Sequence, residues 1–255
     1  MPVANLEFVD RGLALAESAR EQRIVLRILG SLAYRLHCPA NLQLFDEMKR
    51  DLTDVDFAAR GDQRKEIRAF LEGLGYEIDQ DLLVATEGAR YFFMDPASRM
   101  GVDVFFDELF FCHQIPLRDR LELDYPTITL ADLVLEKMQI VEINAKDIKD
   151  TLVLLLEHPL DDDGAESIDT AYIAKLLGND WGFYYTVTTN LGKLRTLGVE
   201  YGTLTERQWE VVGARISELE RLIEEEPKTR RWKLRARVGT RVKWYQEVTE
   251  KAATY

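Results

Sequence analysis

The spacing of apolar residues in the first part of the chain predicts several short helices. Apolar residues at helical intervals predict a helix over residues 5–20. A following apolar run is broken at Gly30-Ser31, and its continuation over residues 32–38 has the pattern of the first turns of a helix. Residues 62–76 predict a further amphipathic helix that ends at a pair of glycines. The N-terminal part is therefore expected to contain helices on both sides of Gly30.

Four segments between residues 54 and 106 have the composition of β-strands. One begins at Asp54, and β-branched and aromatic residues predict three more over residues 81–86, 89–94 and 100–106. A Thr-Glu-Gly turn after residue 85 favours an antiparallel meander of these three. We expect the strands to form one mixed sheet with helices on its flanks.

From Thr129 almost to the end, the pattern is helical. The predicted helices cover residues 130–141, 146–158, 168–178, 181–196, 205–226 and 229–250. Pro126 interrupts the chain between the two kinds of pattern. We therefore predict an α+β fold with two domains: residues 1–127 hold the mixed sheet, and residues 128–255 form an all-helical domain.

The charge of the chain is unevenly distributed. Its net charge is −12, which argues against a general nucleic-acid binder. Residues 228–245 nevertheless hold eight Lys/Arg and no Asp or Glu, so this segment carries +8 and the remainder −20 (−12 − 8). Trp232, Trp244 and Tyr245 stand among these cations. The segment is expected either to clamp an RNA backbone and stack its bases, or to dock on the acidic body, including residues 161–163.

Cysteine content and hydropathy indicate the compartment. The two cysteines, Cys38 and Cys112, are too few for a disulfide framework, and no apolar stretch has the length of a membrane span. With no signal-peptide pattern at the start, we expect a cytoplasmic protein with no membrane association. Each cysteine stands beside a histidine, His37 or His113, but the spacing is not that of zinc ligands.

Three aspartates in strand-like segments are the strongest candidates for chemistry. Asp54 and Asp56 share one face of a strand, about 6–7 Å apart. Two carboxylates that close are costly unless a cation lies between them. Asp103 lies within another apolar strand and is favoured over Asp107 as the third carboxylate. Carboxylates are ligands that Mg²⁺ prefers, so these residues predict a site for two magnesium ions.

Two further features support a site that binds phosphate. Gly30 and Ser31 stand at the start of a helix, where unpaired N–H groups bind anions and glycine permits a close approach. Lys137 falls on the apolar stripe of its helix, and a lysine on a core face usually has a partner or a function. The stripe consists of Leu130, Leu133, Val134, Met138 and Val141.

At these residues the sequence resembles the nucleotidyltransferase superfamily with a polymerase-beta-like core, and most closely the AbiEii-type toxin nucleotidyltransferases. The motifs are "LGSLAYRL", "LTDVDF", "VDVFF" and "LEKMQIVEINAKDIKD", and the resemblance covers residues 23–157. It implies that the N-terminal domain is a nucleotidyltransferase core.

The resemblance also implies a role for each candidate residue. Gly30 and Ser31 would hold the triphosphate. Asp54 and Asp56 would bind the metals, while Asp103 would bind a metal and act as the base towards the acceptor. Further along the chain, Lys137 would contact phosphate, and Asp147 would act in the site or brace it.

The activity implied is transfer of a nucleoside monophosphate from an NTP to a hydroxyl, with two Mg²⁺ ions. The acceptor would be RNA, such as a tRNA end, or a small molecule; a cationic one such as an aminoglycoside would suit the acidic body. In a toxin, an antitoxin protein would be a partner. The alternative is a non-catalytic member of the fold that binds a nucleotide or a protein partner.

Overall fold

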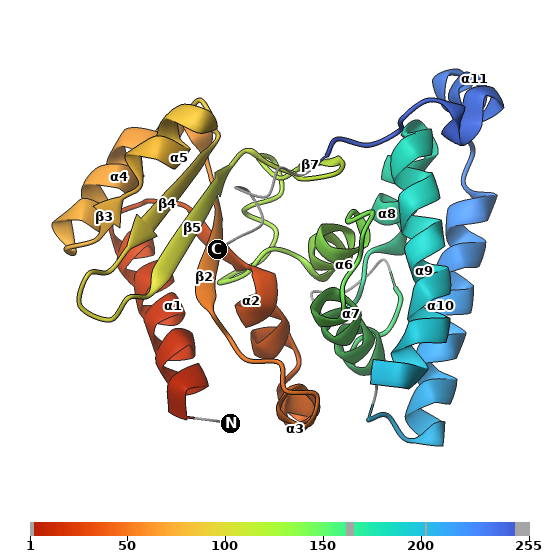
Figure 1. Ribbon diagram of the computed structural model, residues 1–255, viewed down its shortest axis with the longest axis horizontal. Helices are drawn as coiled ribbons and strands as arrows, with labels where there is room; N and C mark the ends of the chain where they lie inside the picture. The colour runs from red at the N-terminus through yellow and green to blue at the C-terminus, as the bar shows by residue number, and fades with distance from the viewer. Residues whose placement is uncertain (1–2, 162–165, 202, 248–255) are drawn as a thin grey trace.

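The computed structural model describes residues 3–161, 166–201 and 203–247, and its N-terminal half is built on a mixed five-stranded sheet (Figure 1). The strand order is β1-β2-β5-β4-β3. β2 and β5 run parallel, and the other three neighbouring pairs are antiparallel. The strands are β1 (Leu26–Leu29), β2 (Asp54–Ala59), β3 (Glu77–Ile78), β4 (Arg90–Met94) and β5 (Gly101–Phe106).

The two central strands have one apolar face and one acidic face. In β2, Val55 and Phe57 are fully buried, whereas Asp54 and Asp56 point to the opposite side. Helix α1 (Val3–Glu21) covers the apolar face, because Gly12 lies against Val55. All residues of β5 are buried, whereas Asp54 and Asp56 on β2 are partly exposed.

Short helices surround the sheet. Helix α2 (Gly30–His37) follows β1 directly, and α4 (Arg64–Gly73) packs beside β3. The remaining short elements are α3 (Leu42–Glu47), α5 (Gln80–Ala85), the 3-10 turns Pro39–Asn41, Gly61–Gln63 and Gly239–Arg241, and a hairpin of β6 (Glu108–Phe110) and β7 (Gln114–Pro116).

Beyond the strands the described chain is helical, and α9 and α10 run side by side along the outer edge (Figure 1). The helices are α6 (Leu130–Met138), α7 (Ala145–Glu157), α8 (Thr170–Asn179), α9 (Trp181–Tyr201), α10 (Glu206–Glu225) and α11 (Arg230–Val238). One hydrophobic core runs from the sheet through α2 into α6–α10. The α+β class is confirmed, whereas the division at residues 127/128 stays a prediction.

Two predicted elements are wrong. Residues 81–86 were expected to be a strand, but they belong largely to α5, because the Asp79 side chain caps this helix by accepting from Leu82 N at 2.9 Å. The edge strand of the meander is β3 instead. The helix expected over residues 229–250 ends at Val238, since Gly239 takes a left-handed backbone with φ +60°. Residues 248–250 lie outside the described part.

In the described part of the chain, each helix is too short or too polar to cross a bilayer.

Candidate functional site

The register of the two parallel strands brings the three predicted aspartates to one face. Asp56 lies directly beside Asp103, and Asp54 lies beside Gly101, which has no side chain. Because Asp54 and Asp56 are two residues apart on one strand, all three carboxylates point to the same side. Asp107, the alternative to Asp103, instead accepts from Gly61 N at 2.9 Å and pairs with Arg118. The structure therefore places Asp103, and not Asp107, beside Asp56.

A pocket of about 630 Å³ opens over this face, which is within the size range of small-molecule sites. Its wall is formed by the three aspartates, the start of α2, α6 and the start of α7. All the predicted site residues except Gly30 line it. The lining consists of Leu29, Ser31, Arg50, Thr53, Asp54, Asp56, Arg90, Asp103, Phe105, Phe111, Cys112, Glu136, Lys137, Ile140, Val141, Glu142, Asn144, Lys146, Asp147, Tyr245 and Glu247.

Position 30 requires glycine for two reasons, its backbone conformation and the closeness of the Asp56 side chain. The φ of Gly30 is +66°, and a Cβ at this position would lie 2.1 Å from Asp56 Oδ2. The sequence predicted that the N–H groups here receive a phosphate. In this structure, Gly30 N donates to Glu136 Oε2 at 3.1 Å, so a carboxylate occupies the anion position.

Lys137 lies at the centre of a group of carboxylates. Its Nζ is 3.2 Å from Glu136, 3.5 Å from Asp147 and 3.8 Å from Asp150, and it faces the ring of Tyr34. Burial by itself lowers the pKa of this amine, but the three carboxylates outweigh that effect and raise the pKa above its ordinary value. Lys137 is therefore a fixed positive charge at the pocket wall.

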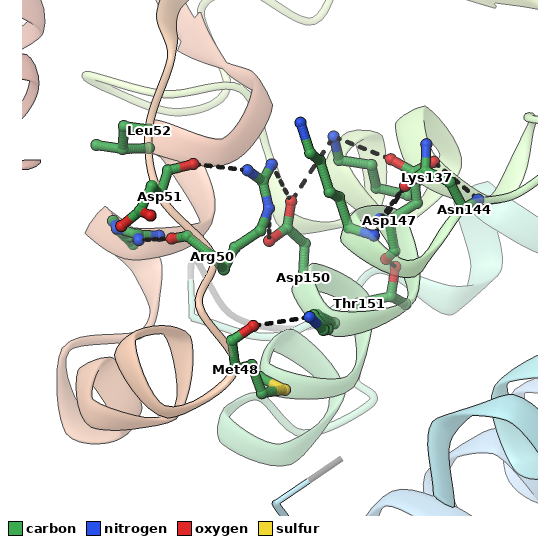
Figure 2. Close-up of polar contacts among 12 residues, drawn as sticks. Met48, Arg50, Asp51, Leu52, Lys137, Asn144, Asp147, Asp150 and Thr151 are labelled. Carbon is green, nitrogen blue, oxygen red and sulfur yellow. Dashed lines mark hydrogen bonds and ion pairs between the residues drawn. The ribbon is translucent and has the colours of Figure 1, made fainter. Parts of the chain in front are cut away.

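The start of α7 is held by two sets of polar contacts (Figure 2). Asn144 and Asp147 form a capping box: Asn144 Oδ1 accepts from Asp147 N at 3.1 Å, and Asp147 Oδ2 accepts from Asn144 N at 3.5 Å. One turn later, the fully buried Asp150 accepts two hydrogen bonds of 2.9 Å from Arg50. Asp147 thus both caps the helix and contacts Lys137.

Asp103 has a partner that the sequence analysis missed. Arg90 Nε donates to Asp103 Oδ1 at 2.8 Å, and Arg90 Nη2 contacts the other oxygen. Arg90 lies on β4, which pairs with β5 on the side away from β2. Burial raises the pKa of Asp103 in spite of this arginine. The arginine therefore contacts both oxygens of the carboxylate that was expected to bind metal.

The surroundings of Asp54 and Asp56 disfavour their charged forms. Burial raises the pKa of Asp56 well above its usual range, and the nearby carboxylates of Asp54, Asp103 and Glu136 raise it further. Burial also raises the pKa of Asp54. A hydrogen bond from Thr53 and the positive charges of Lys137 and Arg50 act in the opposite direction and lower this pKa. A divalent cation at Asp54 and Asp56 would relieve this repulsion, and carboxylate oxygens suit Mg²⁺.

The ligand oxygens of Asp54, Asp56 and Asp103 do not all lie within 4.8 Å of one another in this arrangement. Among the described residues, the group of three metal-binding side chains whose ligand atoms all lie within 4.8 Å is His37, His158 and Glu166. That group lies away from the aspartates and includes neither cysteine of the unfavoured zinc pattern.

The basic C-terminal segment docks on the protein itself. Trp232 packs against Tyr184 with ring centroids 5.1 Å apart, and Trp244 Nε1 donates to Thr186 Oγ1 at 3.1 Å. These contacts are to α9 rather than to residues 161–163, of which 162 and 163 lie outside the described part. Tyr245, in contrast, lines the pocket. Two of the three aromatic residues are thus packed against α9, while Arg231, Lys233 and Arg237 remain exposed.

Sequence reasoning could not have identified Arg50, Arg90 and Glu136 as site residues, because their roles come from contacts between distant segments. For Glu136, the sequence offered one indication, its position directly before Lys137. No family model matches the chain, and comparison with curated proteins and with solved structures found no match either.

Proposed function

We propose that this chain is a magnesium-dependent nucleotidyltransferase, with residues 1–127 as the nucleotidyltransferase core and residues 128–255 as a helical domain. The reaction transfers a nucleoside monophosphate from an NTP to a hydroxyl. The observation that carries the proposal is the pairing of Asp56 with Asp103, with Asp54 on the same face of the pocket.

Asp54, Asp56 and Asp103 would hold the two Mg²⁺ ions. Bound there, the ions supply charge that activates the attacking hydroxyl and stabilises the leaving pyrophosphate. Gly30 and Ser31 direct the N–H groups at the start of α2 toward the triphosphate, and this requires Glu136 to leave Gly30 N. Lys137 is the neighbouring cation for this carboxylate, since Glu136 Oε1 is 3.2 Å from Lys137 Nζ in the structure.

In the transfer step, the acceptor oxygen forms a bond to the α-phosphorus while the bond to the β-phosphate oxygen breaks. Pyrophosphate carries away the electron pair of that bond. Asp103 accepts the proton of the acceptor hydroxyl, which requires its contact with Arg90 to rearrange. Lys137, held at the pocket wall by Asp147, contributes positive charge toward the phosphates.

A second candidate function is a non-catalytic protein that binds a nucleotide or a protein partner. Two contacts favour it: Arg90 engages both oxygens of Asp103, and Glu136 occupies the N–H of Gly30. Both contacts have to rearrange for catalysis, whereas a protein that only binds could retain the pair between Asp103 and Arg90.

The acceptor is proposed to be RNA, such as a tRNA end, reached through exposed cations of residues 228–245. Arg231, Lys233 and Arg237 stand on α11 with exposed side chains. The −20 charge of the remainder suits a cationic small molecule such as an aminoglycoside as the other acceptor. A toxin role, with an antitoxin protein as the partner, follows only if RNA is the acceptor.

The test is incubation of the protein with each labelled NTP and Mg²⁺, with total cellular RNA or an aminoglycoside panel as acceptor. Transfer of label with release of pyrophosphate supports the enzyme, and its loss in Asp54→Asn assigns the site. Asp119→Asn is the control, because this aspartate is exposed and outside the pocket. Mg²⁺-dependent NTP binding without pyrophosphate release would support the second candidate. Absence of NTP binding would refute the enzyme and the nucleotide-binding form of the second candidate.

A further inference from the structure

Two buried histidines meet at the far ends of the helices that border the pocket. His37 is the last residue of α2, and His158 is the residue that caps the C-terminus of α7. They are 8% and 4% exposed, and their rings meet edge to face with centroids 6.0 Å apart. Glu166 adds a carboxylate, and one ligand atom of each of the three residues lies within 4.8 Å of the others.

The contacts of His158 leave one ring nitrogen without a suitable partner. Its Nε2 is 2.8 Å from the main-chain oxygen of His37, and its Nδ1 is 3.0 Å from the main-chain oxygen of Glu166. The Glu166 carboxylate is also 3.7 Å from Nδ1. A neutral imidazole has one N–H, so it can donate to only one of these oxygens. If Nε2 carries the hydrogen, the lone pair of Nδ1 faces oxygen atoms, and a positive species is needed between them.

Two side-chain oxygen atoms lie beside the ring of His37. Its Nε2 is 2.6 Å from Thr127 Oγ1 and 3.6 Å from Asp124 Oδ2. A neutral imidazole at His37 retains one lone pair that can face a metal ion. Asp124 contacts His37, but it is not among the three residues whose ligand atoms all lie within 4.8 Å of one another.

We propose that His37, His158 and Glu166 bind a divalent transition-metal ion such as Zn²⁺. Imidazole nitrogen and carboxylate oxygen are the ligands that Zn²⁺ accepts in a tetrahedral site. The hydrogen bond from His158 Nε2 to a main-chain oxygen is the contact that orients a metal-binding histidine. The ends of both helices also favour a cation, because a helix C-terminus carries partial negative charge.

A metal ion at this site would hold α2 and α7 together at the ends that lie away from the pocket. α2 and α7 pack against each other, and both begin at the pocket and end at the histidines. An eight-residue helix is about 12 Å long, so this ion is separate from the cations proposed at Asp54 and Asp56. A metal that joins the two ends fixes the relative position of Gly30 and Asp147. This inference is independent of the proposed nucleotidyltransferase activity.

The test is calorimetric titration of the metal-free full-length protein with Zn²⁺ at pH 7.5, together with Co²⁺ as a spectroscopic probe. We expect one equivalent to bind, with the visible absorption of tetrahedral Co²⁺. Glu166→Gln should weaken binding at least tenfold without changing the fold, because Glu166 is exposed. Glu210→Gln, the same change on the exposed face of α10, should bind as the unchanged protein does.

Two more variants complete the test. His158→Gln should abolish the Co²⁺ spectrum; if this variant fails to fold, Glu166→Gln carries the conclusion. Asp54→Asn should leave Zn²⁺ affinity unchanged, and a loss of the ion in this variant would place it in the aspartate pocket and overturn the proposal. The absence of binding at pH 7.5, or an imidazolium at His158 in NMR spectra of the metal-free protein at that pH, would also overturn it.

Discussion

Replacement of Asp56 by asparagine should stabilise the metal-free protein at neutral and alkaline pH. The surroundings of Asp56 disfavour its charged form, because burial and three nearby carboxylates all raise its pKa. Asparagine has nearly the same shape and no charge. Within the described residues, the Asp56 side chain makes no hydrogen bond that the change would remove. The substitution therefore relieves repulsion at little structural cost.

The expected size follows from the strand geometry. Asp54 and Asp56 are about 6.6 Å apart along β2, and two unit charges at that distance repel by about 2.5 kcal/mol at an effective dielectric constant of 20. Asp103 contributes less, because Arg90 already compensates its charge. Water in the open pocket screens part of the repulsion, so we expect a gain of about 1–2 kcal/mol in the free energy of unfolding.

The gain should depend on pH with a defined sign. The folded pKa of Asp56 is raised above the unfolded value, so the unfolded chain loses its proton first as the pH rises. The unchanged protein therefore loses stability from about pH 4 upward, until the folded pKa is passed. Asp56→Asn should equal it at acid pH and exceed it at pH 8.

Urea unfolding in EDTA at pH 4 and pH 8 measures this directly, with the exposed Asp119→Asn as the control. Added Mg²⁺ should stabilise the unchanged protein more than the variant. A variant that is less stable at pH 8, or that gains equally at both pH values, would show that Asp56 is not under charge repulsion.

Three further changes test other parts of the site and its surroundings. Gly30→Ala should cost roughly 1–3 kcal/mol in urea unfolding and abolish transfer, because alanine is strained at φ +66° and would displace Asp56; wild-type stability would contradict this. Asp150→Ala should cost roughly 3–5 kcal/mol by leaving Arg50 buried without its partner, and a loss below about 1 kcal/mol would contradict the assignment. Burial lowers the pKa of His113 to about 4, so the unfolded chain binds the proton first as the pH falls below 6.5. The free energy of unfolding should therefore drop by about 2 kcal/mol between pH 7 and pH 5. Urea unfolding of His113→Gln at the two pH values should show that most of this drop is gone.

The sheet could be predicted where side-chain alternation is strong. In β2 and β5, apolar residues alternate with aspartates, which indicated both the strands and the face of each carboxylate. Residues 81–86 are equally apolar, but one hydrogen bond from the Asp79 side chain starts a helix there, and Val84 is left exposed. Short apolar runs do not distinguish the two structures by composition alone.

The candidate site could be predicted only in part for a related reason. The three aspartates follow from strand periodicity, and Lys137 follows from its place on an apolar stripe. Arg90 becomes a partner of Asp103 only through the register of β4 with β5, and Glu136 reaches Gly30 across 106 residues. Contacts of this kind depend on tertiary packing, which leaves no local pattern in the sequence.

The most direct test of the account is calorimetric titration with non-hydrolysable NTP analogues, in Mg²⁺ and in EDTA. The account predicts that at least one analogue binds at least tenfold more tightly with Mg²⁺, and that Asp56→Asn removes this difference while remaining folded. Equal affinity in both conditions, or an unchanged Mg²⁺ dependence in Asp56→Asn, would contradict the claim that the aspartates of β2 and β5 bind metal and nucleotide together.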